Sequence, residues 1–460
     1  MTKKITLIWL LSLLSGSLWG QMYYDDGRLI YAGDSTVQGS YQALGINPAN
    51  LGRVQSFRMG GGVLQFGGNF HSEGLNLTQL VSLGFSDRAF DGTLRDQLLQ
   101  QNAAPSETFG VDGNFDMNWG AYSVAGPQLG GIAVSLQDRV AGSASIPNPF
   151  FGVLLQGQDA DALQGVPNPD SLRSLGDGTR ANFSHIRSLR VGYGRKLITL
   201  LDSGITLYAG ATFQRLWGIG YYQADIEAGR FTSLAAFSDA YRINYNNVNL
   251  QDPNDQRRLL SSSGRGWALD LGVSADIGDK INVGLAVIDM GSLTWDDNLV
   301  AAEADFDAIL DSLQTSLINS YGLNQEVGNI YDLVEESAGE SFRTALNTQV
   351  RMDASYRVSR RIVLGADLVI PFRNGSERVV DRDAGVLTAT ASWTIIPRVV
   401  NFGTGLIYSP SFGYRWPAGL TVGFGRAALS ITTADFLTFL TSRDPLASLS
   451  VAFITGLHGH

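Results

Sequence analysis

Residues 267–277, with the sequence Trp-Ala-Leu-Asp-Leu-Gly-Val-Ser-Ala-Asp-Ile, alternate between apolar residues and polar or small ones. Trp267 and Leu271 belong to the apolar set, and Asp270 and Asp276 belong to the other set. Because successive side chains of a β-strand point to opposite faces, this stretch predicts a strand with one apolar and one polar face. Its length of about ten residues suits a tilted strand that crosses a bilayer.

The same period of two recurs in residues 205–214, 347–358 and 387–395, among others. Counted in this way, the chain contains about fourteen strands, an even number as in bacterial outer-membrane barrels. They are expected at 54–70, 107–124, 128–140, 183–199, 204–217, 263–278, 280–291, 347–358, 361–372, 384–395, 399–408, 417–425, 427–435 and 447–457. The predicted fold is therefore all-β, an up-and-down antiparallel transmembrane β-barrel of about fourteen strands.

A large soluble β-sandwich is the alternative fold for such alternating strands. The connections, however, alternate between tight turns, as at Gly126–Pro127 and Gly278–Asp279, and long segments, as at 71–106 and 292–346. Short periplasmic turns and longer outer loops are typical of outer-membrane barrels, so this alternation favours the barrel. The tyrosine-rich segment 218–250 is expected to extend two strands beyond the membrane as a hairpin.

The composition excludes several classes of protein. The chain has 460 residues, no cysteine, 54 glycines and a formal net charge of −10. The absence of cysteine excludes disulfides and cysteine-ligated metal centres, and the acidic charge argues against a nucleic-acid partner. Apart from His458 and His460, which are expected to lie in a frayed carboxy terminus, the histidines are not spaced as a metal site, and no glycine cluster opens a helix to bind a dinucleotide. We therefore expect no enzyme activity, no cofactor and no bound metal.

The amino terminus predicts export. Lys3 and Lys4 precede an apolar run from Ile5 to Leu14 and then several small residues, which is typical of a signal peptide over residues 1–20. Residues 21–53 precede the first strand and are expected to form a plug or periplasmic segment, and residues 54–460 form the barrel. Within the plug, the turn-forming residues Asn47, Pro48, Ala49 and Asn50 predict an inward-folded latch, with a simple surface turn as the alternative.

One segment breaks the period of two. Residues 302–319 carry apolar side chains at a three–four spacing, which predicts an amphipathic helix in an extracellular loop insert at about 298–345. The apolar residues of this helix are Phe306, Ile309, Leu310, Leu313 and Leu317. The helix is expected to pack as a lid over loops, or to act as a gate or a face for a partner protein.

Charged residues on the polar faces of the predicted strands would point into the barrel lumen. These residues are Arg190, Asp270, Asp276, Arg351, Asp353, Arg357 and Asp367. Charges are tolerated in the lumen but are costly on the lipid face. They are expected either to form ion pairs that brace the barrel or to line a channel that selects a solute.

The export signal, the early Asn47-Pro48-Ala49 and the fourteen or so strands resemble the group of long-chain fatty-acid transporter (FadL-like) barrels, which includes the secretion-linked barrel PorV. A closer resemblance is to an uncharacterised outer-membrane family of Bacteroidota, known only as a domain of unknown function. The residues that carry it are 266–272, 287–291, 293–295, 364–367 and 412–420. The resemblance implies location in the outer membrane, the amino terminus implies export with cleavage of the signal peptide, and the FadL-like group implies a hydrophobic ligand.

These observations lead to two main hypotheses for function. The first is an outer-membrane transporter or channel for small hydrophobic molecules. The alternative is a non-enzymatic structural or accessory barrel of an envelope or protein-secretion complex. A weaker third hypothesis is a lipid-modifying barrel enzyme. The expected partners are outer-membrane lipid, a small hydrophobic ligand and an envelope or secretion-complex protein.

Overall fold

The computed structural model describes residues 40–54, 58–72, 108–156, 174–200, 204–241, 261–306, 335–372, 385–397, 399–410, 413–424, 427–437 and 446–458. The predicted signal peptide at 1–20 lies outside these residues. So do four residues of the predicted gating helix, namely Ile309, Leu310, Leu313 and Leu317.

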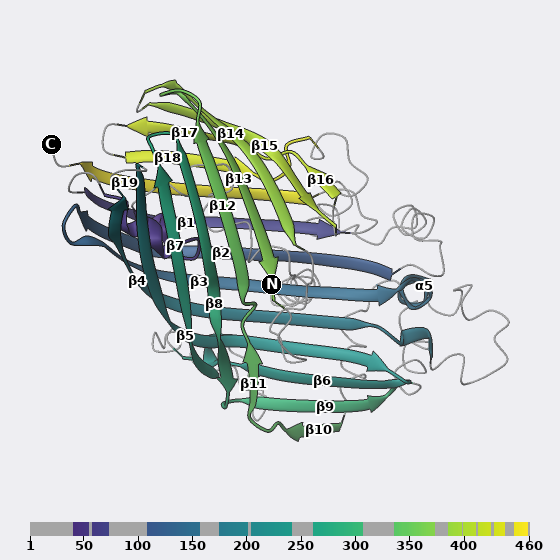
Figure 1. Cartoon of the computed structure of the whole chain (residues 1–460). Coiled ribbons are helices and arrows are strands. Elements are labelled where there is room, and N and C mark those ends of the chain that lie inside the picture. Colours follow the sequence, from purple (N-terminus) through teal and green to yellow (C-terminus); the bar gives the residue numbers. More distant parts are fainter. Residues whose placement is uncertain are drawn as a thin grey trace.

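Fourteen antiparallel strands close into a barrel (Figure 1). In ring order they are β1 (Arg58–Ser72), β2 (Thr108–Gly126), β3 (Gly130–Pro147), β4 (Arg180–Leu200), β5 (Ile205–Glu227), β7 (Gly264–Ile277), β8 (Ile281–Trp295), β12 (Gln349–Arg357), β13 (Ile362–Pro371), β14 (Val386–Ile396), β15 (Val400–Ser409), β17 (Ala418–Phe424), β18 (Ala427–Thr433) and β19 (Leu446–His458). Because β1 pairs with both β2 and β19, the sheet has no open edge within this ring. The predicted all-β barrel and its strand number are confirmed.

The barrel has two different ends. At one end, which we call the short-turn end, tight turns join β2 to β3 and β7 to β8, Leu200 of β4 pairs with Ile205 of β5, and β1 begins and β19 ends there. At the other end, the long-loop end, longer segments separate β1 from β2 and β8 from β12. The short-turn end lies to the left in Figure 1. This arrangement agrees with the expected alternation of short and long connections.

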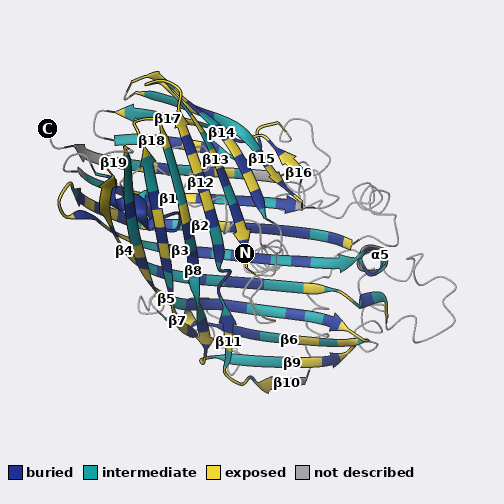
Figure 2. Cartoon of the chain, in the orientation of Figure 1, coloured by how far each residue is buried: buried dark blue, intermediate teal, exposed yellow. Residues whose placement is uncertain are grey.

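Burial alternates along the strands with the polarity of a membrane barrel (Figure 2). Trp267 is 54% exposed and Phe213 is 50% exposed, whereas Gln214 and Asp270 are fully buried. A soluble sandwich would bury its apolar face, but here the apolar face is outside and the polar face is inside. Polarity and ring closure together exclude the sandwich alternative.

Several strands continue past the barrel at the long-loop end. β5 runs to Glu227, turns at Ala228 (φ 53°) and Gly229 (φ 72°), and returns as β6 (Arg230–Phe237). Two consecutive positive φ values are those of a type I′ turn, which matches the twist of a two-residue hairpin. The hairpin itself is therefore confirmed for its described part, and its position beyond the membrane stays a prediction. β6 pairs in turn with β9 (Leu299–Asp305), and β9 with β10 (Glu335–Ala338).

The prediction of a helix over 302–319 is wrong for its first four residues, because residues 302–305 belong to β9. In β9, Ala302 and Ala304 alternate with Glu303 and Asp305, and the strand is hydrogen-bonded on both sides. The described parts of the insert at 298–345 are thus mostly strands, since β11 (Phe342–Ala345) also pairs with β8. Phe306 is fully buried and packs edge-on against Phe150, 5.1 Å between ring centroids.

The remaining described elements are short. They are η2 (Tyr41–Ala43), η3 (Pro48–Gly52), α5 (Asn148–Gln156), η6 (Ser174–Gly176), η7 (Asp239–Tyr241) and β16 (Gly413–Arg415). The helix α5 lies between the strands expected at 128–140 and 183–199. Within the part of the chain that the structure describes, no helix is long and apolar enough to cross a membrane.

Candidate functional site: the plugged lumen

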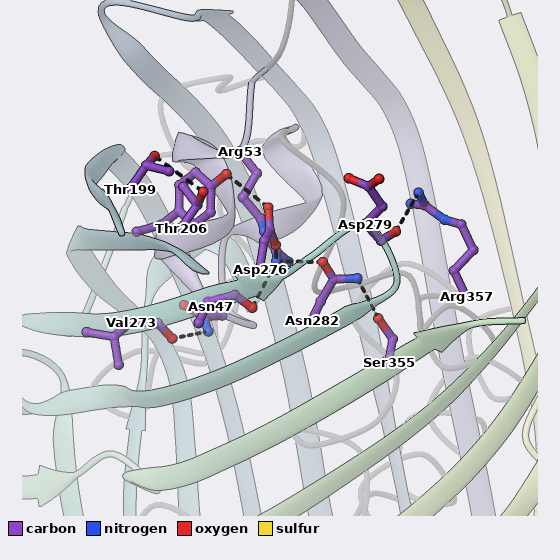
Figure 3. A network of polar contacts seen from close by, with 12 residues as sticks. Asn47, Arg53, Thr199, Thr206, Val273, Asp276, Asp279, Asn282, Ser355 and Arg357 are labelled. Carbon is purple, nitrogen blue, oxygen red and sulfur yellow. Dashed lines mark hydrogen bonds and ion pairs between the residues drawn. The ribbon is translucent and has the colours of Figure 1, made fainter. Parts of the chain in front are cut away.

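The seven predicted lumen charges lie at two depths. Five of them are buried inside the barrel, and these are Arg190, Asp270, Arg351, Asp353 and Asp367. Asp276 lies at the short-turn mouth, where its side chain is 28% exposed. Arg357 is the exposed last residue of β12, and it donates to the carbonyl of Asp279 at 3.3 Å (Figure 3). The structure thus agrees with the inward orientation of five residues, and their role stays a prediction.

One buried polar network joins five consecutive strands on the lumen side, near the middle of the strands. Nη1 of Arg139 on β3 donates to Oδ2 of Asp289 on β8 at 2.9 Å, although three strands separate β3 from β8 in the ring. Nε2 of Gln214 donates to Oδ1 of Asp270 at 2.7 Å and to Oδ1 of Asp289 at 2.8 Å. Nε of Arg190 donates to Oε1 of Gln214 at 3.2 Å. The network braces one side of the lumen.

A β-bulge places Asp289 in this network. Opposite Asp270, two residues of β8 occupy the space of one, and Asp289 takes a left-handed conformation with φ 55°. Its backbone N–H donates to Oδ1 of Asp270 at 2.8 Å, which replaces the interrupted ladder bond. Sequence analysis did not select Arg139, Gln214 or Asp289. The adjacent apolar residues Val287 and Ile288, which break the period of two, are the local sign of this bulge.

A second charged group lies on β12 and β13. Nη2 of Arg351 donates to Oδ2 of Asp367 at 2.7 Å, and both side chains are at least nine-tenths buried. Asp353 is paired in register with Asp367 on one side and with Gly284 on the other. Because Gly284 has no side chain, the carboxylate of Asp353 and the amide of Asn47 both approach it. Asp353 therefore faces the amino-terminal segment.

That amino-terminal segment, residues 40–54, lies inside the barrel at the short-turn end, and we call it the plug. Asn47 caps η3: its Oδ1 accepts from the N–H of Ala49 at 3.1 Å, and Pro48 opens the turn. Nδ2 of Asn47 donates to the carbonyl of Val273 on β7 at 3.1 Å. Asn47, Ala49 and Asn50 are fully buried and Pro48 is buried, so the surface-turn alternative does not hold.

A row of glycines makes room for the plug. Gly131, Gly194, Gly210 and Gly272 lie on four adjacent strands and are paired in register from one strand to the next. A Cβ at Gly210 would lie 2.6 Å from the backbone nitrogen of Ala49, and one at Gly194 would lie 2.8 Å from that of Gly52. Glycine within a strand often marks the close approach of another backbone. These four residues form the surface on which η3 rests.

Arg53 fixes the carboxyl end of the plug (Figure 3). Its Nη2 forms an ion pair with Asp276 and donates to Oδ1 of Asn282 at 2.9 Å. Oδ2 of Asp276 also accepts from the hydroxyl of Tyr208 at 2.9 Å, and Nδ2 of Asn282 donates to Oγ of Ser355 at 3.1 Å. One plug residue thus connects β5, β7, β8 and β12 by polar contacts.

Near the long-loop end the inner face becomes apolar. Its buried cluster consists of Ala141, Ile186, Leu216, Tyr221, Ala236, Ala268, Leu293, Trp295 and Leu346. Trp295 is fully buried, lies 5.3 Å from Tyr221 between ring centroids, and donates from Nε1 to Oγ1 of Thr344 at 2.9 Å. The lumen therefore contains, from the short-turn end, a plug, a polar network and an aromatic cluster. Among the described residues, no group of three or more His, Asp or Glu side chains is arranged to hold a metal ion.

The barrel is similar to several solved outer-membrane proteins. The toluene transporter TbuX of Ralstonia pickettii has a TM-score of 0.49 at 11% identity, covering 96% of this chain and 100% of that one. The toluene transporter TodX of P. putida has a TM-score of 0.47 at 8% identity, covering 95% and 99%. A FadL homologue of Pseudomonas aeruginosa has a TM-score of 0.42 at 12% identity, covering 96% and 97%.

Among curated proteins, none matches the chain. One family model, described as a family of unknown function (DUF5723), matches residues 48–433, from the plug to the end of β18. The resemblance to a family without an assigned reaction is thereby confirmed. The chain belongs to this family of unknown function, DUF5723.

Proposed function

We propose that the chain is an outer-membrane channel or transporter for small molecules, and that the plug closes its periplasmic mouth. The observation that supports this most is the plug itself. The mouth is filled by the plug, which precedes the barrel strands and rests on the backbone of the glycine row, rather than by side chains of the barrel wall. A closure of that kind is able to leave without unfolding the barrel.

The proposed solute is a small hydrophobic molecule. This class comes from the sequence resemblance to fatty-acid transporter barrels. The buried aromatic cluster around Trp295 makes the long-loop part of the lumen apolar, which suits such a solute, whereas the network around Asp289 suits a polar one. No chemical reaction is part of the proposal. In the proposed orientation the short-turn end is periplasmic, because short turns are periplasmic in such barrels.

The second candidate is an accessory barrel of an envelope or secretion complex. It is favoured by the length of β4 and β5, which have 21 and 23 residues, about twice what a tilted strand needs to cross a bilayer. Their outer parts, with β6, β9 and β10, form a sheet beyond the membrane that is suited to docking. In this role the plug would brace the barrel permanently.

Native mass spectrometry of the full chain, taken from its outer membrane in mild detergent, separates the two candidates. A lone barrel carrying a small apolar mass supports transport and identifies the class of solute. A barrel that leaves with a stoichiometric protein partner, and without a small ligand, refutes transport and supports the accessory role. The empty barrel of a strain grown without apolar carbon sources is the matched control for adventitious ligands.

A further inference from the structure

Three exposed arginines lie close together on the outer, lipid-facing side of the barrel wall. They are Arg215 on β5, Arg265 on β7 and Arg343 on β11. Arg265 is paired in register with Thr294 of β8, and Thr294 with Arg343. Arg215 is paired with Trp267, the next outward residue below Arg265. We call these three residues the arginine row.

The arginine row lies at the edge of the apolar belt. On β7 the outward residues from Ile277 to Trp267 are all apolar, and Arg265 is the next outward residue. These ten steps correspond to about 33 Å of strand, or about 25 Å of height at a tilt of about 40°. That height equals the apolar band of an outer-membrane barrel. The row is therefore at the membrane border on the long-loop side, where lipid headgroups lie.

The charges of the row are not neutralised by neighbouring side chains. Among the described residues, none of the three arginines forms an ion pair. Nε of Arg343 donates to Oγ of Ser292 at 2.8 Å, and Nη1 of Arg215 donates to the carbonyl of Gly266 at 3.4 Å, which leaves further donors of each guanidinium available. By contrast, the neighbouring Arg187 donates twice to Asp138, at 2.7 and 2.8 Å. A cluster of free positive charge is notable in a chain of net charge −10.

The spacing of the row suits a phosphorylated headgroup. Neighbouring strands are about 4.8 Å apart, so Arg265 and Arg343, two strands apart, are separated by about 10 Å, and the row, with Arg215 offset by two residues, spans about 16 Å. Guanidinium groups bind phosphate through two parallel hydrogen bonds, and side chains on such a row are long enough to converge on one headgroup. Trp267 and Trp217 lie beside the row on the same face, as aromatic residues do at membrane interfaces.

We propose that the arginine row binds the phosphate groups of a lipid in the outer leaflet, and that this contact fixes the barrel in the surrounding lipid. The inference rests on the proposed outer-membrane location and is independent of what the lumen transports. Charge complementarity and the position at the edge of the apolar belt both favour a lipid phosphate over a soluble one, because lipid surrounds the barrel wall up to this edge.

The test is native mass spectrometry of the purified full chain with diphosphorylated lipid A, and with phosphatidylcholine as the zwitterionic comparison. The variant is Arg215→Gln/Arg265→Gln/Arg343→Gln. The matched control is Arg360→Gln/Arg361→Gln, which removes exposed arginines at the short-turn end. An arginine at an anionic surface is worth roughly fivefold in affinity. We therefore expect the triple variant to lose lipid A binding at least about tenfold, with the control variant unchanged.

Three results would overturn the proposal. The first is that the triple variant binds lipid A as well as the wild type does. The second is that phosphatidylcholine binds as well as lipid A. The third is that millimolar inorganic phosphate displaces lipid A completely, which would mark the row as a site for a soluble anion. Heat-dependent mobility of the barrel on gels shows that each variant is folded. Because solute retention in the lumen is measured separately, failure of this proposal is distinguishable from failure of the proposed channel function.

Discussion

Replacing Gly210 by valine should release the plug from the barrel mouth. The ring of barrel strands should stay intact. Even the first added atom, a Cβ, would lie 2.6 Å from the backbone nitrogen of Ala49, closer than real Cβ atoms come to other heavy atoms. The neighbour is backbone, which has no rotamer to change. Valine itself is favourable in a strand, so the strain falls on the plug rather than on β5.

The expected size of the effect follows from the cost of overpacking, about 1–3 kcal/mol. A cost of that size, applied only to the docked state, raises the population of released plug about 5- to 150-fold. The assay uses Ala49→Cys, since the chain contains no cysteine and Ala49 is fully buried in the docked plug. We expect maleimide to label this cysteine 5- to 150-fold faster in the Gly210→Val background.

Gly120→Ala in the same cysteine background is the matched control. A Cβ at Gly120, also in a barrel strand, would have no heavy atom within 4 Å. Its labelling rate should equal that of Ala49→Cys alone. If Gly210→Val labels no faster than Gly120→Ala while its barrel remains folded, the plug does not rest on the glycine row and the reasoning is refuted.

Three further predictions concern the contacts inside the barrel. Arg53→Met should weaken plug docking by about 1.5–3 kcal/mol, because charge-assisted hydrogen bonds to Asn282 and Asp276 are lost. Limited proteolysis should then cut the plug faster than in the wild type, and equal cutting would contradict this. Trp295→Ala should cost about 3–5 kcal/mol in thermal unfolding, whereas Trp267→Ala, at an exposed site, should change the melting temperature little; equal losses would show that the aromatic cluster is not a packed core. Asp289→Asn should destabilise the barrel by about 3–5 kcal/mol, because Arg139 is left buried without its partner. Adding Arg139→Met should restore part of this loss, and a double variant whose loss equals the sum of the two single losses would argue against the pair.

The strands were predictable because their signal is local. The period of two alone located β13 at 361–372 against an observed Ile362–Pro371, and β5 at 204–217 against an observed start at Ile205. Polar and apolar faces within each strand follow from the same period, which is why Arg190, Asp270 and Asp353 were expected inside. For residues 47–50 the sequence predicted a turn, since Asn and Pro open one, and it left both an inward-folded latch and a surface turn open.

The insert was mispredicted because its strands depend on distant partners. Phe306 and the residues after it have a helical spacing, yet residues 299–305 are fixed as β9 by ladders to β6 and β10. Neither partner is visible in a local window, and tertiary pairing overrides a weak local preference. The helix itself lies mostly outside the described residues and stays a prediction, as do the signal peptide and the Bacteroidota origin.

The contacts of the lumen were not predictable from one sequence. Arg139 and Asp289 are 150 residues apart and meet only because the ring closes. The four glycines of the plug surface are separated along the chain, and only the strand register aligns them. Register across a barrel depends on the stagger of every strand pair, which no local pattern contains. Composition therefore indicates that the residues on the polar faces are small, but not that four of them form a docking surface for the plug.

The most direct test of a passage closed by a plug is uptake of an apolar fluorescent probe, N-phenylnaphthylamine, by cells with an intact outer membrane. Cells with no barrel, with the wild type and with Gly210→Val are compared at equal barrel abundance. The account predicts faster uptake with the wild type than without the barrel, and faster uptake still with Gly210→Val. Uptake that is the same in all three strains would contradict it and leave the plug as a permanent structural element.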